Sequence, residues 1–207
     1  MYAYPTQMTD ELIDAIATLD KVVKYVDIPL QHSHPEVLKR MRRPVMDYTK
    51  LVEKIRAKIP NVSVRTTLIV GYPGETEEEF EHLYNFVKNV KFDRMGAFEY
   101  SREKGTYSYG LKPQIDDKIK KERRDKLMEL QQKISLKNNQ KYIGSTLKCI
   151  VEGYTDDGVI ILRSEHDAPE IDGVVYATSD REVVPGVLEN VRITKVDEYD
   201  LFGEVED

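Results

Sequence analysis

This sequence is poor in cysteine and tryptophan. Cys149 is the single cysteine among its 207 residues, and there is no tryptophan. One cysteine excludes an internal disulfide, and it excludes a cysteine-only metal or iron–sulfur site built from this chain alone. We therefore expect a reduced, cytoplasmic setting. Because Cys149 stands in an apolar segment, we expect its thiol to be packed in a hydrophobic core.

Long apolar runs are missing as well. No stretch approaches the roughly 20 apolar residues that a membrane span needs, so we expect no membrane partner. Residues 1–15 do not join a basic segment to an apolar one, which argues against a secretory signal. The sequence has no Walker A loop, no GxGxxG fingerprint and no pattern typical of a Ser–His–Asp triad. Hydrophobic residues still make up 40% of the chain, enough for a folded core.

Acidic and basic residues are distributed unevenly. The net charge is −6, but residues 143–207 hold five basic and sixteen acidic residues, a net charge of −11, whereas residues 1–142 carry +5. This change of sign predicts two domains, 1–142 and 143–207. An acidic domain repels phosphate backbones and attracts basic surfaces. A surface that only keeps the protein soluble is the alternative.

Strands and helices alternate in the first hundred residues. We expect four strands, at 1–4, 24–30, 64–70 and 92–100, with helices in each of the three gaps. This order favours an α/β fold with a parallel sheet made of βαβ units. Four strands are half of the eight in a complete barrel, so the sheet is either open or part of a longer barrel. A charged helix over 115–140 is expected to lie against this sheet.

Short alternating strands fill the acidic part of the chain. Turn signals such as Asp157-Gly158 and Pro185-Gly186 separate them. Five such strands predict a small closed β-barrel of the OB-like kind. They are expected at 146–154, 158–164, 174–179, 190–199 and 201–206.

Polar residues follow the strand expected at 24–30. Gln31 and Ser33 are suited to hydrogen-bonding a small polar ligand, or to capping the helix that follows. His32 and His34 are two residues apart, but the sequence offers no third ligand beside them, which argues against a metal site.

The strand at 64–70 leads into a second candidate region. TLIVGYPGET, residues 67–76, places a glycine turn between a strand and a helix. The backbone amides of this turn either bind a ligand, or the turn serves only to reverse the direction of the chain. Arg65 stands in this otherwise apolar strand, and a buried charge requires an anionic partner, either in the protein or in a ligand.

Four segments, in this order, resemble the radical S-adenosylmethionine (SAM) methylthiotransferases: DIPLQHSHPEVLKRMRR, RTTLIVGYPGETEEEF, FEYSREKGT and HDAPEIDG. The resemblance covers nearly the whole chain. It implies that residues up to about 110 are the C-terminal part of a radical SAM partial (βα) barrel. It also implies that residues 143–207 form a TRAM domain, the small β-barrel that these enzymes carry.

The resemblance implies a transferase that uses SAM and two [4Fe–4S] clusters and receives electrons from an external donor. One branch of the family adds a methylthio group to the β-carbon of an aspartate in ribosomal protein S-twelve, and a sister branch modifies an adenosine in tRNA. The segment DAPEIDG resembles the form of the TRAM domain found in the first branch. The acidic terminal domain favours the same branch, because ribosomal proteins are basic. A tRNA-modifying enzyme remains the alternative.

Site residues follow from the same resemblance. Gln31 and Ser33 would contact the ribose or methionine part of SAM, and Arg65 would pair with its carboxylate. The strand that contacts the adenine would contribute Thr67, Ile69, Val70 and Gly71. The residues expected to dock the substrate protein are Asp167, Glu170 and Asp172.

One departure from the family pattern is large. The CxxxCxxC motif that holds the radical-generating cluster is absent. We therefore expect no metal ligand and no catalytic residue in this chain, which alone would be inactive and would be a fragment of a longer enzyme. A cluster-free module that docks on a ribosomal or RNA partner is a further alternative.

Overall fold

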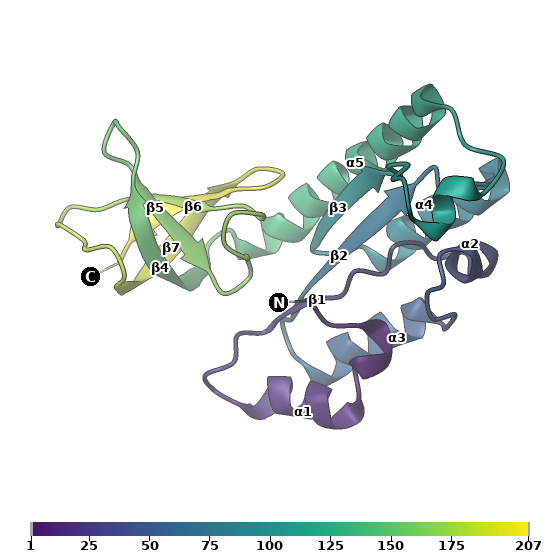
Figure 1. The fold of residues 1–207 in the computed structure, drawn as a ribbon. Coiled ribbons are helices and arrows are strands. Elements are labelled where there is room, and N and C mark those ends of the chain that lie inside the picture. The colour runs from purple at the N-terminus through teal and green to yellow at the C-terminus, as the bar shows by residue number, and fades with distance from the viewer. Residues whose placement is uncertain (1, 207) are drawn as a thin grey trace. The chain divides into compact units, whose positions relative to one another are not determined.

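The computed structural model describes residues 2–206, which form two compact units (Figure 1). Residues up to 131, apart from 23–25, make up the first unit. Residues 23–25 and those from 132 onward make up the second. The division between Gln131 and Gln132 lies inside α5 (Asp117–Asn139). The domain boundary expected at residue 142 stays a prediction.

The sheet of the first unit has three strands in the order β1-β2-β3. These strands are β1 (Tyr25–Asp27), β2 (Ser63–Val70) and β3 (Arg94–Glu99). β2 and β3 run parallel, with Arg65 opposite Arg94 and Val70 opposite Glu99. β2 reads SVRTTLIV, and its β-branched side chains suit a buried central strand. The predicted α/β fold is confirmed.

The strand predicted at residues 1–4 is wrong for the part that the structure describes. Tyr2 makes a single parallel bridge to Asp27, and Met1 lies outside the described residues. Pro5 has no N–H to donate to a ladder, and it begins a short 3-10 helix, η1 (Pro5–Gln7), in place of a longer strand. The described sheet therefore has three strands where the sequence predicted four.

Side chains cap the starts of several of the α-helices. Thr9 caps α1 (Asp10–Thr18) by accepting from the Leu12 amide, and Asp47 caps α3 (Tyr48–Lys58). Thr76 and Glu79 form a capping box at the start of α4 (Glu77–Val90). The remaining helices are α2 (Pro35–Arg40), α5, η2 (Tyr107–Gly110) and η3 (Gln140–Tyr142).

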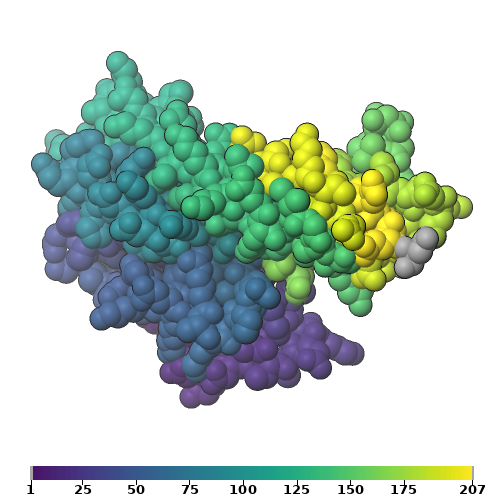
Figure 2. Space-filling view, turned by 180° about the vertical axis from the view of Figure 1, so that it is seen from behind, coloured from purple at the N-terminus to yellow at the C-terminus, as the bar shows by residue number. Residues whose placement is uncertain are grey.

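Large side chains from these helices and from the sheet form the core of the first unit. Phe80 and Leu83 of α4 and Ile55 of α3 are fully buried, and so are Leu68 of β2 and Leu127 of α5. The opposite side of α5 is charged and lies on the surface seen in Figure 2. Part of α5 thus packs on the first unit, as the sequence predicted.

The second unit is a closed five-stranded barrel in the order β4-β5-β6-β8-β7. Its strands are β4 (Thr146–Tyr154), β5 (Ile160–Ser164), β6 (Val175–Thr178), β7 (Leu188–Val196) and β8 (Leu201–Val205). Neighbouring strands are antiparallel except β6 and β8. Gly203 approaches the backbone so closely that a Cβ would lie 2.3 Å from the Arg192 carbonyl oxygen. The predicted small barrel is confirmed.

Within residues 2–206, no helix is both long enough and apolar enough to cross a bilayer.

Candidate functional site

A cavity of about 590 Å³ lies at the carboxyl ends of the strands in the first unit. Its walls come from three segments that leave the sheet and from β2 and β3 themselves, and they include Gln31, Arg42, Ile69, Phe98, Tyr100 and Tyr107. We call it the strand-end cavity. Parallel α/β sheets bind ligands at this edge, because the loops that follow the strands converge there.

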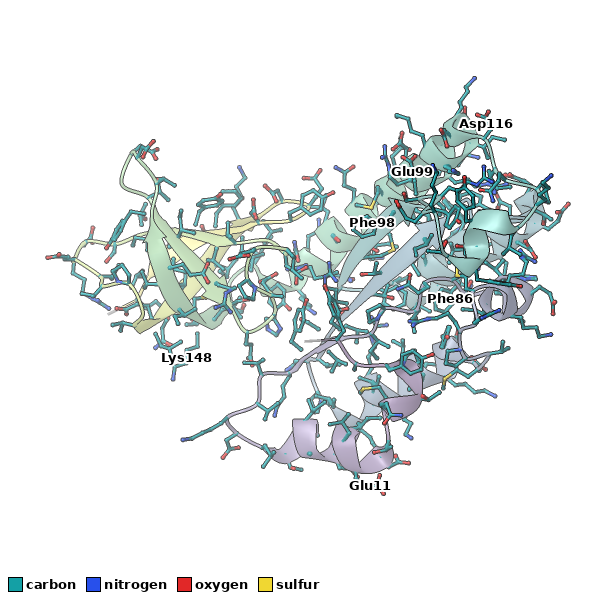
Figure 3. The ribbon with its side chains drawn as sticks, viewed as in Figure 1. Glu11, Phe86, Phe98, Glu99, Asp116 and Lys148 are labelled. Atoms are coloured by element: carbon teal, nitrogen blue, oxygen red, sulfur yellow. The ribbon has the colours of Figure 1, made fainter. Side chains whose placement is uncertain are left out.

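Side chains alternate along β2, so Arg65, Thr67 and Ile69 share one face of the sheet. Their register partners on β3 include Gly96 and Phe98, which extend the same face. The Phe98 side chain is 57% exposed and projects from β3 beside Glu99 (Figure 3). This face, which we call the open face, leads into the strand-end cavity.

The chemistry of the cavity wall is mixed. The Tyr100 hydroxyl is buried and has no hydrogen-bond partner among the described residues. The Arg42 guanidinium lies 3.8 Å above the centre of the Tyr107 ring. Aromatic walls with a few polar groups are typical of sites for small amphipathic ligands. An unpartnered hydroxyl at such a wall fits a polar ligand, because an unsatisfied buried group is costly.

Two of the predicted ligand contacts, Gln31 and Ile69, line this cavity. Gln31 has a positive φ of 70°, and its backbone pairs with the end of β2. The Gln31 backbone amide donates to the Thr67 backbone carbonyl at 2.9 Å, and the Ile69 backbone amide donates to the Gln31 backbone carbonyl at 2.8 Å. The chain after β1 is thereby tied to the end of β2, which brings these predicted residues together.

Arg65 has an anionic partner within the protein. Its Nη1 lies 2.8 Å from Asp27 Oδ2, and both side chains are buried. The same nitrogen donates to Thr67 Oγ1 at 3.3 Å. A Cβ on Gly96 would lie 3.3 Å from Phe98 Cε2 but 3.9 Å from Arg65 Nη2, so the glycine makes room for the Phe98 ring and not for the guanidinium. The ion pair with Asp27 accounts for the buried charge, and a contact with SAM stays a prediction.

Five predicted contacts are not on the cavity wall: Ser33, Arg65, Thr67, Val70 and Gly71. Arg65 and Thr67 precede Ile69 on the same face of β2 and contact each other. Ser33 Oγ lies 2.9 Å from His82 Nδ1, and the Val70 side chain is fully buried on the other face of the sheet. Gly71 has a φ of 72°, and a Cβ there would lie 2.3 Å from Lys120 Cγ. The glycine is thus required by the packing of α5.

The amides of the glycine turn are bound by a side chain of the turn itself. Glu75 Oε2 accepts from the Gly71 amide at 2.9 Å and from the Tyr72 amide at 3.4 Å. Its other oxygen lies 2.8 Å from Nη1 of Arg123 in α5. Burial raises the pKa of Glu75, while these hydrogen bonds and Arg123 oppose the shift. The turn is therefore held in place by a buried side chain. The sequence analysis did not predict the ion pair between Glu75 and Arg123, which are 48 positions apart.

His32 lies against the same cluster and is fully buried. Burial lowers its pKa to about 3, so the ring is neutral near pH 7. Its Nδ1 accepts from the His34 amide at 3.0 Å, and its Nε2 faces Glu75 Oε2 at 3.7 Å. Within residues 2–206 no three His, Cys, Asp or Glu side chains converge on a metal position.

The predicted docking residues lie in the loop between β5 and β6 of the second unit. Asp167 is 5% exposed and accepts from Ser164 Oγ at 2.7 Å. Asp172 accepts from the Ala168 amide at 2.9 Å. These two carboxylates hold the loop in shape, whereas Glu170 is exposed. Docking stays a prediction, and Glu170 is the member of the set that can reach a partner directly.

Cys149 is fully buried in the core of the barrel, which confirms the packed thiol expected from the sequence. Burial raises the pKa of this thiol to about 12. A protonated, buried thiol does not fit the role of a cluster ligand, which requires a thiolate.

Comparison with known proteins supports both units. The radical SAM superfamily matches residues 2–87, and the TRAM domain matches residues 143–205. "Ribosomal protein uS12 methylthiotransferase RimO" from Caldanaerobacter subterraneus subsp. tengcongensis is 51% identical and aligns with 99% of this chain. The protein of the same name from Thermoanaerobacter sp. is 50% identical over the same share. The chain spans 47% of the length of each of these two relatives.

Among solved structures, the radical SAM enzyme coproporphyrinogen III oxidase (HemN) from Escherichia coli aligns with 62% of this chain and 29% of its own. Its sequence identity is 17% and its TM-score is 0.49, a likeness on which nothing further rests. The chain thus contains a radical SAM region and a TRAM region, and along nearly its whole length it is about half identical to relatives named as uS12 methylthiotransferases.

Proposed function

We propose that this chain is the part of a uS12 methylthiotransferase that binds SAM along the open face and docks the basic protein substrate. The enzyme would add a methylthio group to the β-carbon of an aspartate in uS12, the ribosomal protein S-twelve. One observation supports this most: the chain is about half identical, over 99% of its length, to relatives named for that activity.

SAM fits the strand-end cavity on chemical grounds. The unpartnered Tyr100 hydroxyl and the polar Gln31 would bind the polar parts of SAM, while Ile69 and the aromatic walls would cover its adenine. Arg65 would pair with the carboxylate of SAM. When bound at a [4Fe–4S] cluster, SAM supplies the radical chemistry of this superfamily, and the protein supplies orientation and exclusion of water.

An iron–sulfur cluster does not fit the residues of this chain. Its one cysteine lies in the barrel core, and no metal-ligating group of side chains converges within residues 2–206. We assign no step of radical formation to these residues. In the whole enzyme the clusters, and the electron donor that reduces them, would be supplied from outside this chain.

The barrel would provide the contact to uS12. Its net charge of −11 suits a basic ribosomal protein, and Glu170 is exposed at the loop that we assign to docking. The site of action would then be the cytoplasm, where ribosomes are assembled. A tRNA substrate is the second candidate, favoured only by the +5 charge of residues 1–142.

The test uses the complete enzyme that contains this chain, assayed for SAM affinity by equilibrium dialysis. Arg65→Ala and Gln31→Ala are each expected to weaken SAM binding several-fold. Lys118→Ala is the control and should leave the affinity unchanged, because this α5 side chain is 84% exposed and is not part of the cavity wall. Unchanged SAM affinity in both open-face variants would remove this face as the SAM site. Methylthiolation of a tRNA adenosine by the same enzyme would overturn the assignment of uS12.

A further inference from the structure

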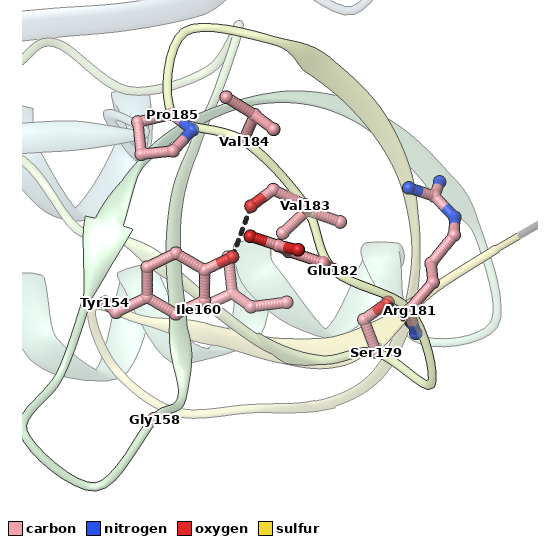
Figure 4. Close-up of a pocket in the computed structure, with 9 residues that line it drawn as sticks. All are labelled: Tyr154, Gly158, Ile160, Ser179, Arg181, Glu182, Val183, Val184 and Pro185. Atoms are coloured by element: carbon pink, nitrogen blue, oxygen red, sulfur yellow. Dashed lines mark hydrogen bonds between the residues drawn. The ribbon is translucent and has the colours of Figure 1, made fainter.

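A second cavity, of about 380 Å³, opens on the barrel (Figure 4). Its apolar walls are Tyr154 at the end of β4, Ile160 at the start of β5, and the segment Val183–Pro185 that precedes β7. The Tyr154 hydroxyl donates to the Val183 carbonyl, which joins two of these walls. We call this cavity the barrel groove.

The groove exposes apolar surface in a unit of high net negative charge. The Tyr154 side chain is 44% exposed and Val184 is 58% exposed, while Ile160 is buried beneath them. Val187 and Leu188, which follow in the chain, are exposed as well. Large apolar side chains gathered at one place on a soluble surface mark a site of interaction.

The rim of the groove is acidic. Arg181 is neutralised there by Glu189, whose two oxygens lie 3.1 and 2.7 Å from its guanidinium nitrogens. Glu182 lines the groove, and Asp156 and Asp180 flank it along the chain. These three exposed carboxylates have no ion-pair partner within residues 2–206. The surroundings of the apolar walls therefore carry uncompensated negative charge.

We propose that the barrel groove receives an apolar side chain from a basic segment of a protein, with flanking Lys or Arg residues paired to the rim carboxylates. The inference deepens the proposed function, on which it rests, by placing the docking of the substrate at a defined pocket. The groove lies near the low end of ligand-pocket volumes, which suits a side chain better than a large ligand. An RNA backbone would meet only repulsion at this rim.

The experiment titrates the chain with uS12 and with two peptides, Lys-Lys-Leu-Lys-Lys and Lys-Lys-Gly-Lys-Lys. The first peptide should bind several-fold more tightly than the second, and Val184→Ser should remove that difference and weaken uS12 binding. Glu182→Gln should lower the affinity for both peptides and reduce its dependence on salt. Ile143→Ser is the matched control, because Ile143 is 51% exposed and lies outside the groove.

The outcomes separate the two proposals. Binding of uS12 that Val184→Ser and Glu182→Gln leave unchanged would overturn the groove inference, while docking elsewhere on the barrel would stand. Selective binding of the leucine peptide without any binding of uS12 would support the groove and count against uS12 as the partner. Binding of tRNA that Val184→Ser weakens would show that the occupant is a nucleic acid and would overturn the inference.

Discussion

At the scale of residues, His32 shows how strongly burial controls a single proton. Folding lowers the pKa of this ring from its usual 6.5 to about 3. Between these values the unfolded chain binds a proton that the folded chain does not accept. The contribution of His32 to the free energy of unfolding is therefore fully present above pH 6.5. It decreases as the pH falls below that value, by up to about 1.4 kcal/mol per pH unit.

Replacing His32 with Gln removes this proton while keeping an acceptor for the His34 amide. Between pH 6.5 and 4.5 we expect the free energy of unfolding of the variant to fall less steeply than that of the wild type, by up to about 1.4 kcal/mol per pH unit. Urea unfolding at a series of pH values measures both slopes, and between pH 7.5 and 8.5 the two should coincide. Equal slopes at acid pH would show that His32 is protonated in the fold.

Cys149 offers a second residue-scale test. Its pKa of about 12 leaves a thiolate fraction at pH 8 roughly a thousandfold below that of a free cysteine, and the surrounding core blocks access as well. A thiol reagent should therefore leave the native chain unmodified over hours and modify one thiol promptly in urea. Rapid reaction of the native chain would contradict the packed barrel core.

At the scale of elements, α5 braces the glycine turn. Arg123 of α5 donates to the Glu75 carboxylate and carbonyl, and it also pairs with Glu77 at the start of α4. Glu75 in turn holds the Gly71 and Tyr72 amides behind the strand-end cavity. One helix thus sets the shape of the loop that forms part of the cavity wall.

Removing Arg123 should be costly, because Glu75 would be left buried without its cation. Arg123→Met is expected to lower the free energy of unfolding by about 3–5 kcal/mol. Chemical denaturation measures this, with Arg124→Met as the control that should change little, since its ion pairs are partly exposed. Adding Glu75→Gln to Arg123→Met should recover part of the loss. No recovery would mean that the charge of Glu75 is not the cause.

Much of the element pattern was predictable from the sequence, and the contacts between elements were not. Turn signals such as Asp157-Gly158 predicted the strands of the barrel, and Thr76 predicted the start of α4, because both act locally. The partner of Arg65 proved to be Asp27, which is 38 residues away. Glu75, which occupies the turn amides, left no local pattern in the sequence. Only the fold brings such pairs together.

At the scale of the whole molecule, the single cysteine leads to a prediction about iron. The chain, reconstituted anaerobically with iron and sulfide, should hold no stoichiometric cluster, because the thiol of Cys149 is buried and no other cysteine is present. Iron analysis and absorption near the charge-transfer bands of clusters measure this. One cluster per chain would contradict the assignment of the cluster ligands to residues outside this sequence.

The distribution of charge leads to the last prediction. An acidic barrel of net charge −11 should attract a basic protein and repel a nucleic acid, and both effects should weaken with salt.

The most direct test of this account is a titration of the chain with uS12 and, separately, with tRNA, at a low and a high salt concentration. We expect selective binding of uS12 that weakens at high salt and is reduced by Glu170→Gln. Selective binding of tRNA would contradict the account and would make the family's tRNA-modifying branch the better assignment.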